Sequence, residues 1–154
     1  MDRKKGILDR IGSLIPGYRG YAERDGRRNC DKQLRESIHF ELTLIEKQIS
    51  NRILDAIKSK EMDLIRKLEV LRKDVNTLGS KLKYAPYGET AFFGDKQIKE
   101  DELLEIYQFD LELADVVQKY KDEIVLIPIE KIELYNTSIF GVLNARNSYI
   151  NEFK

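Results

Sequence analysis

The chain has 154 residues, of which 42% are hydrophobic and 35% charged, with only three prolines and no tryptophan. This composition suits a single domain of long, solvated helices and argues against a β-rich or a disordered chain. The 27 basic and 27 acidic residues cancel, which disfavours nucleic acid as a partner, although residues 1–35 alone hold ten basic and five acidic residues.

The expected location is the cytoplasm. Cys30 is the only cysteine, so it cannot form a disulfide within the chain, which indicates a reducing compartment. The sequence contains no run of 18 apolar residues, and the segment before residue 16 is too often interrupted by charge to resemble a secretory signal.

Residues 1–16 are expected to form a short amphipathic segment that ends at Pro16 and Gly17. Such a helix either lies on an anionic membrane surface, making the protein membrane-peripheral, or folds back onto its own bundle. We favour the second alternative because five apolar residues make a weak anchor. The apolar residues on its stripe are Ile7, Leu8, Ile11, Leu14 and Ile15, and the basic ones are Arg3, Lys4, Lys5 and Arg10.

Two long helices are expected next. The first starts near Tyr18 and carries an apolar stripe that ends at Ile57, and the second carries a stripe with the 3–4 spacing of coiled coils from Leu64 to Leu82. No glycine or proline separates them, so one continuous helix is an alternative, but we expect a turn near residues 58–60 with Ser59 as the N-cap. A first helix of about 41 residues would overhang the others by roughly 20 Å.

Residues 84–97 form a connector with four aromatic residues, Tyr84, Tyr87, Phe92 and Phe93. We expect this connector to be ordered and to cap the end of the bundle, the alternative being an aromatic patch for a partner. A third helix is expected after Lys99, where an acidic run suits a helix N-terminus. A fourth follows Pro128 and continues nearly to the C-terminus.

These elements predict an all-α fold: an antiparallel, up-down-up-down four-helix bundle with a short N-terminal amphipathic helix and an over-long first helix. Residues 1–16 are the N-terminal segment and residues 17–154 the bundle domain. In this topology residues 17–35, residues 84–97 and the C-terminus meet at one end, here called the composite end. We expect Gly20 to allow close approach there, beside a second aromatic cluster of Tyr18, Tyr21, Phe92 and Phe93.

The composite end is the expected partner surface of a non-enzymatic interaction or scaffold protein, whose partner is another protein or a second copy of the chain. Because arginine binds phosphate groups bidentately, the basic N-terminal region could instead serve an adaptor for an anionic membrane or another phosphate-bearing partner. The candidate interaction residues are Tyr18, Arg19, Tyr21, Arg24, Arg27, Arg28, Arg35, Tyr87, Phe92 and Phe93.

The sequence contains few candidates for a catalytic or metal-binding site. Glu36 and His39 form one Glu-x-x-His, half of the motif of di-metal carboxylate bundles, but the chain has no second histidine. Cys30 lacks a neighbouring base that would make it a nucleophile. We therefore expect no enzymatic activity, no metal and no cofactor, the rival hypothesis being an enzyme or metal-binding bundle around Glu36 and His39.

Three acidic residues of the third helix, Asp110, Glu112 and Asp115, could act in acid–base chemistry only if they were buried together. We expect them to solvate a helix face instead.

The stretches LIPGYRGYAERDGRRNCDKQLR and KYAPYGETAFFGDKQIKEDELLEIYQFDLEL resemble a family of uncharacterised prokaryotic helical proteins. The shared pattern is an IPGY-x-GY segment (Ile15 to Tyr21), a Tyr-Gly…Phe-Phe connector (Tyr87 to Phe93) and a Tyr-x-Phe-Asp-Leu run (Tyr107 to Leu111). The resemblance implies a helical fold with a turn between the first two long helices, and it implies no activity. The chain departs from the pattern at Gly26, where a helix-favouring residue is expected.

Overall fold

The computed structural model describes residues 3–84, 90–94 and 96–153. These residues form no strand, which confirms the all-α fold class. Two short 3-10 turns, η1 (Arg24–Gly26) and η2 (Ala91–Phe93), lie in the connecting segments. The α-helices of the described residues are α1 (Arg3–Leu14), α2 (Arg27–Lys58), α3 (Met62–Lys83), α4 (Glu100–Glu123) and α5 (Ile129–Asn151).

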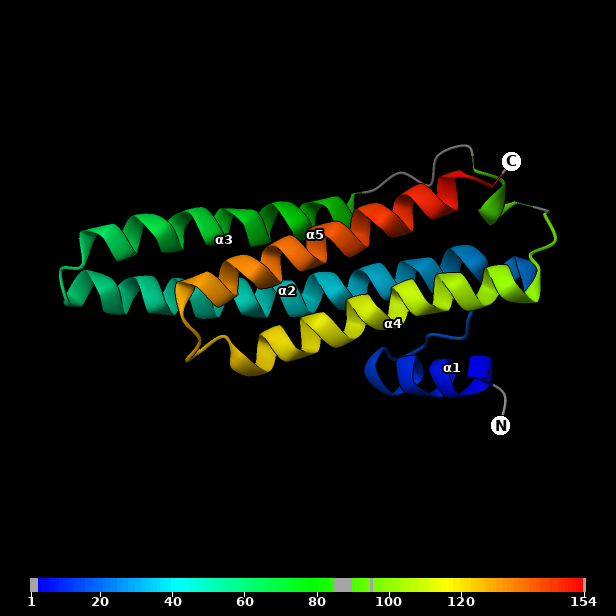
Figure 1. The fold of residues 1–154 in the computed structure, drawn as a ribbon, viewed down its shortest axis with the longest axis horizontal. Coiled ribbons are helices and arrows are strands. Elements are labelled where there is room, and N and C mark those ends of the chain that lie inside the picture. The colour runs from blue at the N-terminus through cyan, green and yellow to red at the C-terminus, as the bar shows by residue number, and fades with distance from the viewer. Residues whose placement is uncertain (1–2, 85–89, 95, 154) are drawn as a thin grey trace.

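Helices α2 to α5 form a bundle in which each helix runs antiparallel to the one before it (Figure 1). Helices α2 and α5 each pack against both α3 and α4, so that the four helices surround a shared core. The apolar stripes expected from the sequence line this core. Among the fully buried side chains are Leu34, Ile45, Leu68, Ile106 and Ile139. The predicted four-helix bundle is therefore confirmed.

A tight turn separates α2 from α3. Lys60 has a positive φ of 57°, and its N–H donates to the Ile57 carbonyl at 3.1 Å, while the Glu61 N–H donates to the Ala56 carbonyl at 3.0 Å. This pair of hydrogen bonds is the Schellman arrangement that ends many helices, here with lysine where glycine is usual. The expected turn near residues 58–60 is confirmed, and the alternative of one continuous helix is wrong. Ser59 as the N-cap of the second helix is also wrong, because Ser59 caps the C-terminus of α2 and the N-cap of α3 is Glu61.

The first long helix begins at Arg27 rather than near Tyr18. Gly17 (φ 82°) and Gly20 (φ 92°) have left-handed backbone conformations, which a right-handed helix cannot contain. Residues 15–23 instead form a non-helical linker. The prediction of a 41-residue helix overhanging at its N-terminal end is therefore wrong. It is the α2–α3 turn, at the opposite end, that projects past the turn between α4 and α5 (Figure 1).

Helix α1 folds back and packs along α4 (Figure 1). Ile11 and the following Ile15 are buried, and Arg10 Nη2 lies 2.8 Å from Asp115 Oδ1 on α4. Of the two alternatives for this segment, the structure shows the one in which its apolar stripe is covered by the bundle. None of the helices in the described ranges is long and apolar enough to cross a membrane.

Gly20 provides a test of the linker. A Cβ atom at this position would lie 2.6 Å from Tyr107 Oη and 3.3 Å from Leu8 Cδ2, and the backbone φ is one that side chains disfavour. We expect Gly20→Leu to lower the free energy of unfolding by about 3 kcal/mol, as measured by urea denaturation. In the control Gly12→Ala the added Cβ meets nothing within 4 Å, so stability should stay the same or rise by up to about 1 kcal/mol. Unchanged stability of Gly20→Leu would contradict this account of the linker.

Candidate functional site

A cluster of buried polar side chains lies near the N-terminal end of α2. Tyr18 and Tyr21 come from the linker, Asp31 from α2, Asp110 from α4 and Arg146 from α5. All five residues are less than a tenth exposed, and both aspartates are fully buried. Side chains from four separate segments of the chain thus meet in one place, which we call the buried cluster.

Arg146 is at the centre of the buried cluster. Its Nε donates to Asp110 Oδ1 at 2.6 Å, and its Nη2 donates to Asp31 Oδ1 at 2.7 Å and to the Tyr21 hydroxyl at 2.9 Å. Burial lowers the pKa of Arg146, but Asp110, Tyr21 and Asp31 raise it by more, so that the net pKa is well above its usual value. The guanidinium therefore stays charged in the folded protein.

The two aspartates use their remaining oxygen atoms on other partners. Asp110 Oδ2 accepts hydrogen bonds from the hydroxyls of Tyr18 and Tyr21, both at 2.6 Å. Asp31 Oδ2 lies 2.8 Å from Arg35 Nε, in an ion pair whose geometry is not that of a hydrogen bond. Two arginines thus balance two aspartates. Burial and the charge of Asp110 raise the pKa of Tyr18 well above its usual value.

This arrangement is suited to holding segments together rather than to chemistry. Every carboxylate oxygen of Asp31 and Asp110 is engaged within the protein, and neither residue is exposed to solvent. A buried ion pair of this kind is costly to disrupt, because removing one member leaves the other charge uncompensated. The buried cluster therefore fixes the linker, α2, α4 and α5 relative to one another.

An aromatic layer adjoins the buried cluster. The Tyr21 ring stacks on Tyr107 with centroids 5.8 Å apart, and it meets the edge of Phe92 at 5.2 Å. Phe92 in turn contacts Phe93 at 5.0 Å and Phe153 at 5.3 Å. The linker, the connector and the C-terminus are therefore neighbours, which confirms the predicted second aromatic cluster. The close approach at Gly20 is to Tyr107 of α4, however, and not to the connector.

Arg27 lies inside the protein, although the sequence suggested an exposed arginine face. Its Nε donates to the Tyr21 carbonyl at 2.9 Å, and its Nη1 donates to the Lys96 carbonyl at 2.6 Å. Nη1 also reaches the carbonyls of Phe92 and Gly94, each at 3.4 Å. Burial, followed by the charge of Arg24, lowers the pKa of Arg27. Arg27 thus binds the connector to the linker.

The other candidate interaction residues are divided between the interior and the surface. Arg19, Arg24 and Arg28 are exposed, and the Arg28 guanidinium lies 5.6 Å from the centre of the Phe93 ring. Arg35 is half-buried and also donates to the Leu82 carbonyl at 3.4 Å. Tyr87 lies outside the described residues. The buried members serve the fold, and the interaction role of the set stays a prediction. Those buried members are Tyr18, Tyr21, Arg27, Phe92 and Phe93.

The contacts of Glu36, His39 and Cys30 are typical of structural residues. His39 Nδ1 lies 3.0 Å from the Gly79 carbonyl of α3, and Glu36 is exposed with an ion pair to Lys32 at 3.8 Å. Across the described parts of the chain, no group of three potential metal ligands is gathered. Cys30 is buried, and burial, followed by the charge of Asp110, raises its pKa to about 12, so the thiol is protonated at neutral pH.

Sequence reasoning missed two charged members of the buried cluster, Asp110 and Arg146. Asp110 was grouped with Glu112 and Asp115 as a solvated face, but only Glu112 is exposed, and Asp110 is buried. A signal was present in the spacing, since Asp110 follows Tyr107 and precedes Leu113 in the 3–4 pattern of core positions. Arg146 occupies the equivalent position between Leu143 and Ile150.

Comparisons with protein-family models, curated proteins and solved structures found no match. The resemblance to a family of prokaryotic helical proteins therefore stays a prediction.

Replacing Arg146 should strongly destabilise the fold. We expect Arg146→Met to lower the free energy of unfolding by about 3–5 kcal/mol, because it leaves the buried carboxylate of Asp110 without a cation and Asp31 with Arg35 alone. Adding Asp110→Asn to that variant should recover part of the loss. Arg66→Met, which removes an exposed ion pair with Asp63, should change stability by less than about 0.5 kcal/mol. Urea denaturation measures all three, and equal effects of Arg146→Met and Arg66→Met would refute the central role of Arg146.

Stability should also fall at alkaline pH. The pKa of Cys30 rises from 9.0 to about 12 on folding, and those of Tyr18 and Tyr21 rise well above 10.0. Between these values the unfolded chain loses protons that the folded chain keeps, so the free energy of unfolding decreases as pH rises above 9. Urea denaturation from pH 8 to 11 measures this slope. In Cys30→Ala the decrease should begin about one pH unit later, and a flat profile in the unaltered protein would contradict the assignment.

Proposed function

We propose that this chain is a non-enzymatic interaction protein that docks through the projecting tip of the α2–α3 hairpin, with a second copy of the chain as the occupant. The observation that carries the proposal is the exposure of large apolar side chains on both sides of the α2–α3 turn. Soluble proteins seldom expose several such side chains together unless the patch binds something. The residues of this tip surface, each more than half exposed, are Leu54 and Ile57 of α2 and Met62 of α3. Val125 and Leu126, in the turn between α4 and α5, are also more than half exposed.

The tip surface continues the core. Arg52 Nη1 donates to the carbonyls of Ile124 at 3.0 Å and Ile127 at 2.6 Å, which places the α4–α5 turn beside α2 at this level. Helix α2 runs on for another turn and a half, or about 9 Å, without cover from α4 or α5 (Figure 1). Ile53 is buried, while Ile57, one turn further along the same stripe, is 53% exposed.

A second copy of the hairpin would cover the exposed apolar stripe at the end of α2. Two identical hairpins that meet tip against tip in antiparallel fashion would each supply the pair of helices that the other lacks. Such a two-fold contact is self-complementary, because the same residues face each other from both copies. Charge does not oppose it: residues 54–63 hold two basic and three acidic side chains, and the whole chain has zero net charge.

The composite end offers less apolar surface for docking. Its aromatic side chains Phe92 and Phe93 are buried, and so are Tyr18 and Tyr21. The exposed arginines there, Arg19, Arg24 and Arg28, keep open the alternative of a phosphate-bearing partner. The tip surface is favoured because its side chains are exposed and have no cover within the described fold.

Sedimentation velocity over a range of concentrations tests this function. We expect a concentration-dependent dimer with a micromolar dissociation constant, as suits a small apolar interface, and we expect Ile57→Glu to shift the protein to monomer. Phe40→Glu is the matched control, because Phe40 is 59% exposed on the same helix, about 25 Å from Ile57. Circular dichroism checks that both variants fold. A monomeric parent chain, or equal dissociation in the two variants, would overturn the proposal.

A further inference from the structure

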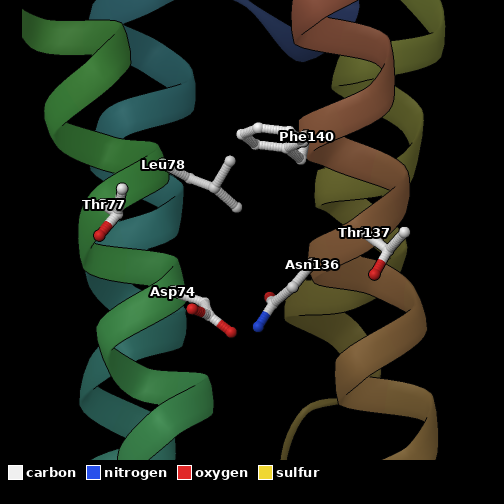
Figure 2. A pocket seen from close by; sticks show the side chains of 6 residues that line it. All are labelled: Asp74, Thr77, Leu78, Asn136, Thr137 and Phe140. Atoms are coloured by element: carbon white, nitrogen blue, oxygen red, sulfur yellow. The ribbon is translucent and has the colours of Figure 1, made fainter.

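A small pocket opens between α3 and α5, away from both the tip surface and the buried cluster. Its volume is about 240 Å³. Figure 2 shows that one part of the pocket is lined by Asp74 and Asn136, and the other by Leu78 and Phe140. Thr77 and Thr137 complete the lining. The pocket therefore has a polar half and an apolar half.

In the polar half, the Asn136 side chain is held by hydrogen bonds, whereas the Asp74 side chain is not. The Asn136 Oδ1 accepts a hydrogen bond from the Tyr120 hydroxyl at 2.7 Å, and its Nδ2 donates to the Leu71 carbonyl at 3.3 Å. The Asp74 carboxylate faces Asn136 across the gap (Figure 2) and forms no ion pair or hydrogen bond with any residue that the structure describes. A carboxylate in this position attracts a cation into the pocket.

The apolar half is suited to a carbon skeleton. Leu78 and the Phe140 ring form its wall (Figure 2). The Lys81 Nζ lies 4.2 Å from the centre of the Phe140 ring, so the chain's own ammonium group already uses a face of this ring. Aromatic faces attract ammonium groups by cation–π interaction.

We propose that this pocket binds a small organic ammonium ion, with its charged group at Asp74 and its carbon skeleton against Leu78 and Phe140. The uncompensated carboxylate selects against anions, and the apolar wall favours an amine with a compact hydrocarbon body over a hydrated metal ion. Benzylamine, which carries an ammonium group next to an aromatic ring, is a small representative of this class.

Titration of the 154-residue chain with benzylamine, followed by amide chemical shifts, tests this pocket. Benzylamine should bind saturably and shift the amides of residues 74–78 and 136–140. Benzyl alcohol and benzoate, which have nearly the same shape without the positive charge, should bind about tenfold more weakly or not at all. Equal binding of the amine and the alcohol, or shifts confined to other residues, would overturn the proposal.

Two substitutions separate the roles of charge and ring. Asp74→Asn should weaken benzylamine binding about tenfold, while Asp63→Asn, at an exposed carboxylate near the start of the same helix, should leave it unchanged. Phe140→Leu should weaken benzylamine binding more than n-butylamine binding, because only the aryl amine loses a ring contact. Since Asp74 and Phe140 are both solvent-exposed, melting temperatures near that of the parent chain are expected. Unaltered benzylamine affinity in Asp74→Asn would refute the site.

Discussion

The structure depends on one buried cation. Arg146 is 2% exposed and lies between two fully buried aspartates, and a buried charge is tolerated only when its partners are held in place. Those partners come from α2 and α4. The tyrosine hydroxyls that donate to the second carboxylate oxygen of Asp110 come from the linker. A shift of any one segment along the bundle would break a charged hydrogen bond. The cluster therefore selects one register for four segments, where apolar packing alone would tolerate several.

This cluster gives the bundle two unlike ends. At the composite end, the linker, the connector and the C-terminal Phe153 close over the polar cluster with an aromatic layer, and Arg27 binds their backbone carbonyls. At the other end, α2 and α3 continue beyond the α4–α5 turn and leave Leu54 and Ile57 exposed. The core is thus closed at one end and open at the other, and the proposed docking rests on this difference.

The sequence predicted the parts of this fold that depend on local spacing. The 3–4 periodicity marks the buried faces of the long helices, and the acidic run after Lys99 and Pro128 mark the starts of α4 and α5. It misplaced the start of α2, because Gly17 and Gly20 have left-handed backbone conformations in a linker that packs against Gln33 of α2 and Tyr107 of α4. The buried cluster was missed because its hydrogen bonds join residues 36 to 125 positions apart, and a charge at a core position is recognisable only once its partner is known.

Polar residues at core positions have two different consequences in this bundle. At Asp31, Asp110 and Arg146 opposite charges meet in ion pairs of 2.6–2.7 Å inside the core. At Asn136 the polar group is neutral, and its amide is satisfied by Tyr120 and a backbone carbonyl of α3. An asparagine fills less of the seam between α3 and α5 than a leucine or phenylalanine would, and the space beside it is bordered by Asp74. The same departure from an apolar stripe thus produces rigidity where opposite charges pair and a pocket where they do not.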